Sequence, residues 1–220
     1  MCADRCFACR YSAGAGRLNV HFYRSDCGRR EIAARIPPIA TFRCWSPGVD
    51  GLPSRGSRRP ANYFWWALAR VGGFAQPAFA EICVEERRRI VHRLIVTPRW
   101  YRFPFMGGSD LQIGEVWTSP VARRRQLARA AIAEAHRRFG FSGSAIWYVT
   151  DSDNVASSAL ARSCGYRLVA VGRRTRPLGL ALFGRYVIDR FLQCEETDTQ
   201  EIAPACSDES AAGRSLSVSH

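Results

Sequence analysis

The sequence predicts a single domain of the α/β (α+β) class. At 220 residues the chain is long enough for one substantial core and too short for two comfortable ones. Hydrophobic residues make up 47% of it and aromatic residues 11%, which excludes wholesale disorder. Between Phe79 and Val171 the pattern runs strand, strand, strand, helix, strand, helix, strand. Strands and helices therefore alternate within one core.

Before residue 79 the pattern is less regular. Residues 18–23 alternate like a short strand, and residues 29–36 suit one or two helical turns that end at a Pro-Pro pair. Residues 46–60 are rich in proline, glycine and serine and predict a loop. Residues 62–70 form an aromatic helix that Gly72 and Gly73 close.

From residue 79 onward the elements are sharper. Strands over 79–85 and 90–97 flank a polar turn and predict a hairpin. The remaining expected elements are a strand over 110–118, a helix over 124–139 with one apolar face, a buried strand over 145–150, a helix over 155–163 and a strand over 166–171. Residues 176–192 suit a last strand or helix, or a basic amphipathic helix on a membrane surface.

Charge divides the chain into a basic body and an acidic end. All 32 basic residues are arginine, so no lysine is available as a catalytic amine. Residues 193–220 carry six acids and one arginine and predict a disordered acidic tail, whereas residues 1–17 predict a loose arm. The domain then spans residues 18–192. This basic body attracts phosphates, anionic lipid, nucleic acid or an acidic protein without choosing among them.

Nine scattered cysteines fit a reducing compartment better than a disulfide scaffold. Cys2, Cys6 and Cys9 have the spacing of an iron–sulfur or zinc site, but they lack the surrounding pattern of either, and we expect no metal. No apolar stretch is long enough to span a bilayer, and the first ten residues lack the apolar core of a signal peptide. We therefore expect a cytoplasmic protein, either free or peripheral at the inner face of the membrane.

The segment TSPVARRRQLA leads directly from the strand over 110–118 into the long helix. The first turn of a helix offers unpaired backbone N–H groups and the positive end of the helix dipole, which together suit a phosphate group. Three consecutive arginines, Arg123 to Arg125, add positive charge there. A phosphate-bearing ligand is the expectation.

Two linked motifs resemble the GNAT acyltransferase superfamily, whose members move an acyl group from acyl-coenzyme A (acyl-CoA) to an amine or hydroxyl. The superfamily pattern is Pro-x-x-Arg-x-x-Gly-x-Gly/Ala between a strand and a helix, then a strand, then Asn and a helix ending in Gly-Phe. Residues 120–128 (PVARRRQLA) stand in the first place, and Asn154 through Gly165-Tyr166 in the second. The resemblance covers residues 79–175 well and 18–78 loosely.

The resemblance implies a mixed, mainly antiparallel sheet with helices on both faces and a splayed strand over 110–118. It also implies acetyl-CoA or another acyl-CoA as co-substrate, with Asn154 contacting the coenzyme arm. Backbone amides of the strand would pair with the pantetheine at Val116, Trp117 and Thr118. Backbone N–H groups would cradle the pyrophosphate at Arg123, Arg124, Arg125, Gln126, Leu127 and Ala128.

Two positions depart from the superfamily pattern. Gln126 stands where a glycine is usual, and Ala161 stands where a tyrosine often protonates the leaving thiolate. The general acid would then be water, a nearby hydroxyl such as Ser157 or Ser163, or absent. For the general base, Glu115 is the only acid in the centre of its strand, where the pattern places it on one face with Ile113 and Trp117. The competing interpretation is that Glu115 faces solvent or pairs with an arginine. His92 is a second candidate for the general base, and the competing interpretation is that it has a structural role.

The function predicted is transfer of an acetyl or other acyl group by direct attack of a small or sugar-like acceptor, an amine or amino sugar. The strand IGEVWT (113–118) is similar to members from cell-surface carbohydrate pathways, and the arginines of the 46–60 loop suit an anionic acceptor. Two alternatives stay open. One is a basic nucleic-acid- or membrane-binding protein on a degenerate fold, with nucleic acid the weaker option. The other is an acyltransferase that uses an acidic acyl carrier protein as donor.

Overall fold

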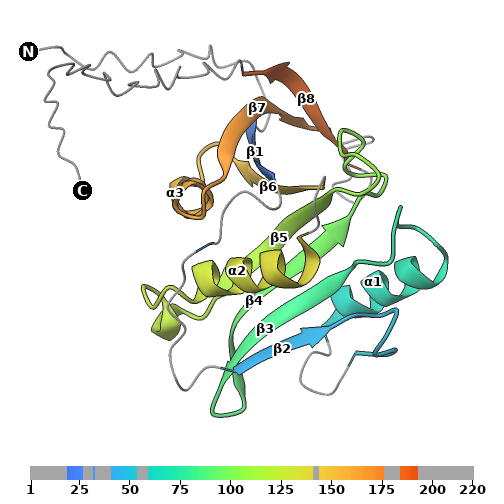
Figure 1. Ribbon diagram of the computed structural model, residues 1–220, viewed down its shortest axis with the longest axis vertical. Helices are drawn as coiled ribbons and strands as arrows, with labels where there is room; N and C mark the ends of the chain where they lie inside the picture. Colours follow the sequence, from blue (N-terminus) through green and yellow to red (C-terminus); the bar gives the residue numbers. More distant parts are fainter. Residues whose placement is uncertain are drawn as a thin grey trace, which may run out of the picture.

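Eight strands form one sheet in the computed structural model, in the order β2-β3-β4-β5-β6-β1-β7-β8 (Figure 1). The structure describes residues 19–26, 32, 41–53, 59–140, 144–175 and 184–192. The strands are β1 (Asn19–Asp26), β2 (Thr41–Trp45), β3 (Ala80–Glu86), β4 (Arg89–Pro98), β5 (Leu111–Thr118), β6 (Ala145–Asp151), β7 (Arg167–Arg174) and β8 (Tyr186–Phe191). The helices are α1 (Pro60–Arg70), α2 (Leu127–Phe139) and α3 (Val155–Ser163). Of the described strand pairs, only β5 and β6 run parallel, so the expected mixed and mainly antiparallel sheet is confirmed.

The helices cover both faces of the sheet, as expected. α2 and α3 pack on one face, where Leu127, Ile132 and Ala161 join the inward side chains of the sheet in one buried cluster. α1 packs on the other face, where Trp65 stacks on Phe79 in a second cluster. Each helix is amphipathic, so the face that it buries is the apolar one.

Strand β1 lies inside the sheet and not at its edge. It pairs antiparallel with both β6 and β7, which follow it by more than a hundred residues. Phe22 and Tyr23 are both fully buried, one in the cluster on each face of the sheet. A central strand is covered on both faces, which is why its side chains do not simply alternate between buried and exposed.

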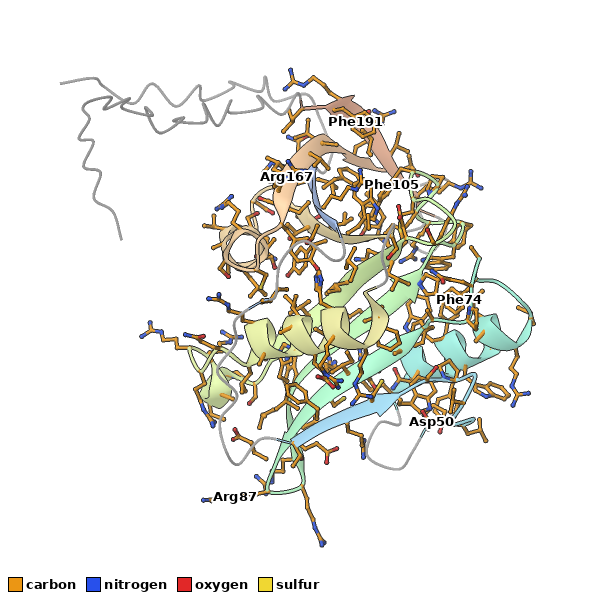
Figure 2. All side chains as sticks on the ribbon, viewed as in Figure 1. Asp50, Phe74, Arg87, Phe105, Arg167 and Phe191 are labelled. Carbon is orange, nitrogen blue, oxygen red and sulfur yellow. The ribbon has the colours of Figure 1, made fainter. Side chains whose placement is uncertain are left out.

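The hairpin between β3 and β4 is confirmed. Its two-residue turn is Arg87–Arg88, and both residues have positive φ angles, 49° and 63°. Two consecutive positive φ angles give the turn whose twist matches a right-handed hairpin. Arg87 extends outward from the tip (Figure 2).

Strand β5 separates from β6 partway along its length. The two strands are paired from Leu111 to Ile113, and no residue of β5 beyond Ile113 pairs with β6. On its other edge β5 pairs with β4, with a bulge at Glu115, whose φ is 48°. A bulge bends its strand and increases the local twist, so it turns the second half of β5 away from β6. The splayed strand expected over 110–118 is therefore present.

Helix α2 begins at Leu127, three residues later than the predicted start at 124. The chain after β5 first makes a 3₁₀ turn over Pro120–Ala122, and Arg124 and Gln126 then take left-handed conformations with φ of 63° and 57°. A left-handed residue cannot continue an α-helix, so the helix starts only after the second of them. The local pattern of side chains does not reveal such a turn.

The described part of the segment 176–192 contains a strand, β8, which pairs with β7. The alternative of an interfacial helix is wrong for Tyr186–Phe191. Strand β2 was not predicted; it lies between the helical turns expected over 29–36 and the loop expected over 46–60. The expected helical turns over 29–36, the arm over 1–17 and the tail over 193–220 lie outside the described residues, apart from Ile32. Within the described residues no helix is long and apolar enough to cross a bilayer.

Candidate active site

The chain between β5 and α2 wraps around a pocket of about 390 Å³. Its lining consists of Thr118, Ala122, Arg123, Arg124, Arg125, Gln126, Leu127, Ala128, Arg129, Leu160 and Ser163. Seven of the ten residues that we expected to hold the coenzyme are among them, and the last two lining residues come from α3. The loop is anchored at its start, because the Ser119 N–H donates to the Val91 carbonyl at 2.9 Å.

The pocket meets the uncapped beginning of α2. Gln126 holds the N-cap position, yet its side chain makes no capping hydrogen bond, and the first turn contains no acidic residue. The N–H groups of a first helical turn have no partner within the helix. They and the positive end of the helix dipole are thus available to an anion in the pocket.

Arginines surround this pocket on the solvent side. Arg123, Arg124 and Arg125 are exposed, and so are Arg87, Arg88 and Arg89 at the hairpin tip. Arg125 joins the two groups, because its guanidinium makes two hydrogen bonds to the Glu86 carboxylate, one of 2.9 Å. We call these six residues the arginine surface. Its charge strengthens attraction of phosphate toward the α2 terminus.

Strands β5 and β6 stop pairing after Ile113, and Thr118 at the end of β5 lines this pocket. We call the divergence of the two strands beyond Ile113 the gap. Val116, Trp117 and Thr118 lie beyond the last residue pair with β6, so one edge of their backbone faces the gap. Val116 packs against the cluster under α2, whereas Trp117 lies on the opposite face of the sheet with the Arg93 guanidinium 4.6 Å from its ring centre. The strand edge therefore presents backbone amides to the gap while its side chains point to either side.

Glu115 lies at the bulge and is paired with an arginine. Its carboxylate is 2.9 Å from the Arg59 guanidinium, and its side chain is 34% exposed. The expectation that it shares a face with Ile113 is wrong, because the bulge moves Glu115 to the α1 face while Ile113 stays under α2. Trp117 is on the α1 face, as the pattern predicted relative to Glu115.

A second carboxylate, which the pattern did not single out, joins this network. Glu81 on β3 is 1% exposed; its carboxylate lies 3.4 Å from Arg59 and accepts a hydrogen bond from the Asn62 amide at 2.9 Å. Its only sequence signal is a charged residue inside an otherwise apolar strand. Arg59, expected in a loop that recognises anions, instead bridges Glu81 and Glu115, while Arg55 and Arg58 lie outside the described residues.

On the other side of the gap, Asn154 caps α3. Its side-chain oxygen accepts the Ser157 N–H at 3.0 Å. The Ser157 side chain in turn hydrogen-bonds Tyr148, and burial raises the pKa of that phenol. Tyr148 is the β6 partner of Ile113, so it stands where the two strands begin to separate. Ala161 is fully buried in the core, and the Ser163 hydroxyl donates to the Leu160 carbonyl within α3.

His92 is fully buried and contacts Thr118, with 2.8 Å between Nδ1 and Oγ1. Burial lowers the pKa of the imidazole to about 4, so it is neutral near pH 7. Among the described residues no cluster of three or more histidine, cysteine or acidic side chains is arranged to hold a metal ion. Cys2, Cys6 and Cys9 lie outside those residues.

No model of a known protein family matches the sequence, and no curated protein matches it. Several solved structures with a similar fold are GNAT-family acetyltransferases. A putative GNAT acetyltransferase from Novosphingobium aromaticivorans is 12% identical, with 71% of this chain and 62% of that one covered at a TM-score of 0.43. A GCN5-related N-acetyltransferase from Sphaerobacter thermophilus is 14% identical, with 70% of this chain and 49% of that one covered at a TM-score of 0.47.

Aminoglycoside N-acetyltransferase AAC(6′)-Iy in complex with coenzyme A is 14% identical, with 58% of this chain and 91% of that one covered at a TM-score of 0.39. The chain spans about half to three-fifths of the first two proteins. At such identities the likeness is one of fold and assigns no activity to this chain.

Proposed function

We propose that this protein is an acyltransferase that takes an acetyl or other acyl group from acyl-CoA. The observation that carries the proposal is the junction of two features: the pocket at the uncapped start of α2 is lined by Thr118, the last residue of the part of β5 that no longer pairs with β6. A ligand with a diphosphate and an extended arm that contains amides would match both: the diphosphate suits the helix terminus, and the arm suits the unpaired edge of β5. The fold and the pocket lining fit this group of co-substrates.

In this proposal the amides of the α2 first turn bind the pyrophosphate of the coenzyme, with charge from Arg123 and Arg124. The exposed edge of Val116 to Thr118 orients the pantetheine arm, and Asn154 flanks it from α3 through its amide NH₂, since its oxygen already caps the helix. When bound, acyl-CoA supplies a thioester, whose C–S bond breaks as the acceptor nitrogen or oxygen bonds to the acyl carbon. Alignment along the strand supplies much of the rate.

The proton steps fall to residues at the two sides of the gap. Tyr148, a neutral phenol whose pKa burial raises further, donates to the leaving thiolate, and the Ser157 hydroxyl supports it. This assignment replaces the tyrosine missing at Ala161. Glu115 accepts the proton of the acceptor directly or through water, with Arg59 fixing the carboxylate. The acceptor then approaches from the α1 face, and a small amine or amino sugar is the class we favour.

Thermal unfolding with acetyl-CoA, free coenzyme A and a long-chain acyl-CoA tests the proposal, because a ligand that binds only the folded protein raises the midpoint. We expect a rise that grows with ligand concentration. An R123A/R124A variant should need about tenfold more coenzyme for the same rise at low salt. R99A is the matched control, since Arg99 is exposed and follows the far end of β4 from the hairpin tip. A folded protein whose midpoint none of the three ligands moves would contradict the proposal.

The arginine surface favours a second candidate donor, an acidic acyl carrier protein. Val121 lies in the same loop and is 89% exposed, so an apolar side chain stands among the arginines. A carrier would present one phosphate and a pantetheine arm to the same pocket. Activity that needs acyl carrier protein, falls steeply with salt and is absent with acyl-CoA would favour this donor. Affinity for DNA or anionic vesicles without any acyl transfer would instead favour a binding protein on this fold.

A further inference from the structure

His92 and Thr118 form a cross-strand pair, and Thr118 lines the pocket. They face each other in the register between β4 and β5, on the α2 side of the sheet. The His92 ring is 0% exposed, and its Nδ1 lies 2.8 Å from the Thr118 Oγ1. Thr118 is half-buried and lines the pocket together with the loop that precedes α2. One wall of the pocket is thus a hydroxyl held by a buried imidazole.

The surroundings of the other ring nitrogen, Nε2, determine which tautomer His92 adopts. His92 Nε2 is buried and has no hydrogen-bond partner. A neutral imidazole carries one N–H, and an N–H left unpaired in the interior costs more than an unpaired acceptor. The proton therefore belongs on Nδ1, which donates to Thr118 Oγ1. Because Oγ1 then accepts from His92, the hydroxyl proton of Thr118 is directed elsewhere.

We propose that His92 is a positioning residue that fixes the Thr118 hydroxyl as a hydrogen-bond donor to a phosphate oxygen in the pocket. This inference rests on the proposed function, since the phosphate is that of the coenzyme. The hydroxyl stands at the end of β5, where the strand edge and the anion pocket meet. It supplies an uncharged side-chain donor to the same pocket that the arginines line.

Coenzyme A binding, measured by calorimetry on the full chain, tests the inference. A hydrogen bond to a charged partner contributes about 1.5–3 kcal/mol, so T118V should weaken binding by roughly 10- to 150-fold. T118S, which keeps the hydroxyl, should bind more tightly than T118V by most of that factor. H92N places an amide N–H near the Nδ1 position and should bind better than H92Q, whose amide reaches the Nε2 position.

A double-mutant cycle separates positioning from simple structural support. H92L should weaken binding in the wild-type background and have little further effect in T118V, because the hydroxyl that it positions is already gone. Equal losses from H92L in both backgrounds, or a T118V protein that binds as tightly as wild type, would overturn the inference. If the wild-type protein itself does not bind coenzyme A, the proposed function is contradicted, and that result is distinct from a failure of the His92 inference alone. Should H92L not fold, the T118V/T118S and H92N/H92Q pairs carry the same test.

Discussion

Gln126 occupies a left-handed backbone conformation, φ 57° and ψ 17°, at the residue before α2. Residues with a Cβ pay about 1–2 kcal/mol for this conformation, and glycine does not. A glycine here also loses more freedom on folding, which offsets about 0.5–1 kcal/mol of the gain. Gln126→Gly should therefore stabilise the folded protein by about 0.5–1 kcal/mol. Because Gln126 is exposed and its side chain caps nothing, losing that side chain costs little.

For a chain of this size, that change corresponds to a rise of about 1–4 °C in the unfolding midpoint. Thermal unfolding followed by circular dichroism measures it. Gln126→Ala is the matched control, because it removes the same side chain and keeps the left-handed cost. A Gly variant no more stable than the Ala variant would refute the reasoning that backbone strain is stored at this position. It would also imply that the loop relaxes to another conformation when no ligand is bound.

Three further changes test the packing of the fold. Burial lowers the pKa of His136 to about 4, so between pH 6.5 and pH 4 the unfolded chain binds a proton at this residue that the folded chain does not. His136 alone should therefore lower the free energy of unfolding by about 3 kcal/mol as the pH falls from 6.5 to 4. His136→Gln should remove that part in urea titrations and leave the similar part that buried His92 contributes. Gly172→Ala would drive a Cβ into the Val187 carbonyl of β8 and should cost about 1–3 kcal/mol, whereas Gly48→Ala, in open space, should cost little. Phe22→Ala, in the central strand, should cost about 3–5 kcal/mol in denaturant unfolding, and a loss below 1 kcal/mol would contradict the central place of β1.

Much of the fold from residue 79 onward could be predicted from local pattern. The hairpin, the strand before the pocket, both helices and the strand between them appear within a few residues of their expected places. These elements depend on contacts between residues close along the chain, such as helical turns and hairpin pairs. The spacing of their apolar residues therefore shows the element directly. The pocket before α2 lies where the sequence predicted a phosphate site, because a strand, a short loop and a helix terminus are adjacent along the chain.

The pairing of the candidate acids and bases could not be predicted in this way. A single bulge at Glu115 separates it from the face of Ile113, and Glu81 and Arg59 reach Glu115 from other elements. Tyr148 is one of several aromatic residues near the end of β5 and along β6, and only the pairing of these strands shows that it lies where they diverge. Each of these relations depends on backbone geometry or on contacts between distant segments, and side-chain periodicity records neither.

The sequence by itself determined the class of fold and the basic body, and it predicted a phosphate site at the start of α2. Only the tertiary structure decided that β1 lies between β6 and β7, where Phe22 and Tyr23 complete the two clusters. Likewise, only the register between β4 and β5 placed the buried His92 against Thr118. The physical reason is that strand pairing over long separations is selected by the burial of whole faces, which is a property of the assembled sheet. A strand's own residues specify that it will be buried, but not which neighbours will bury it.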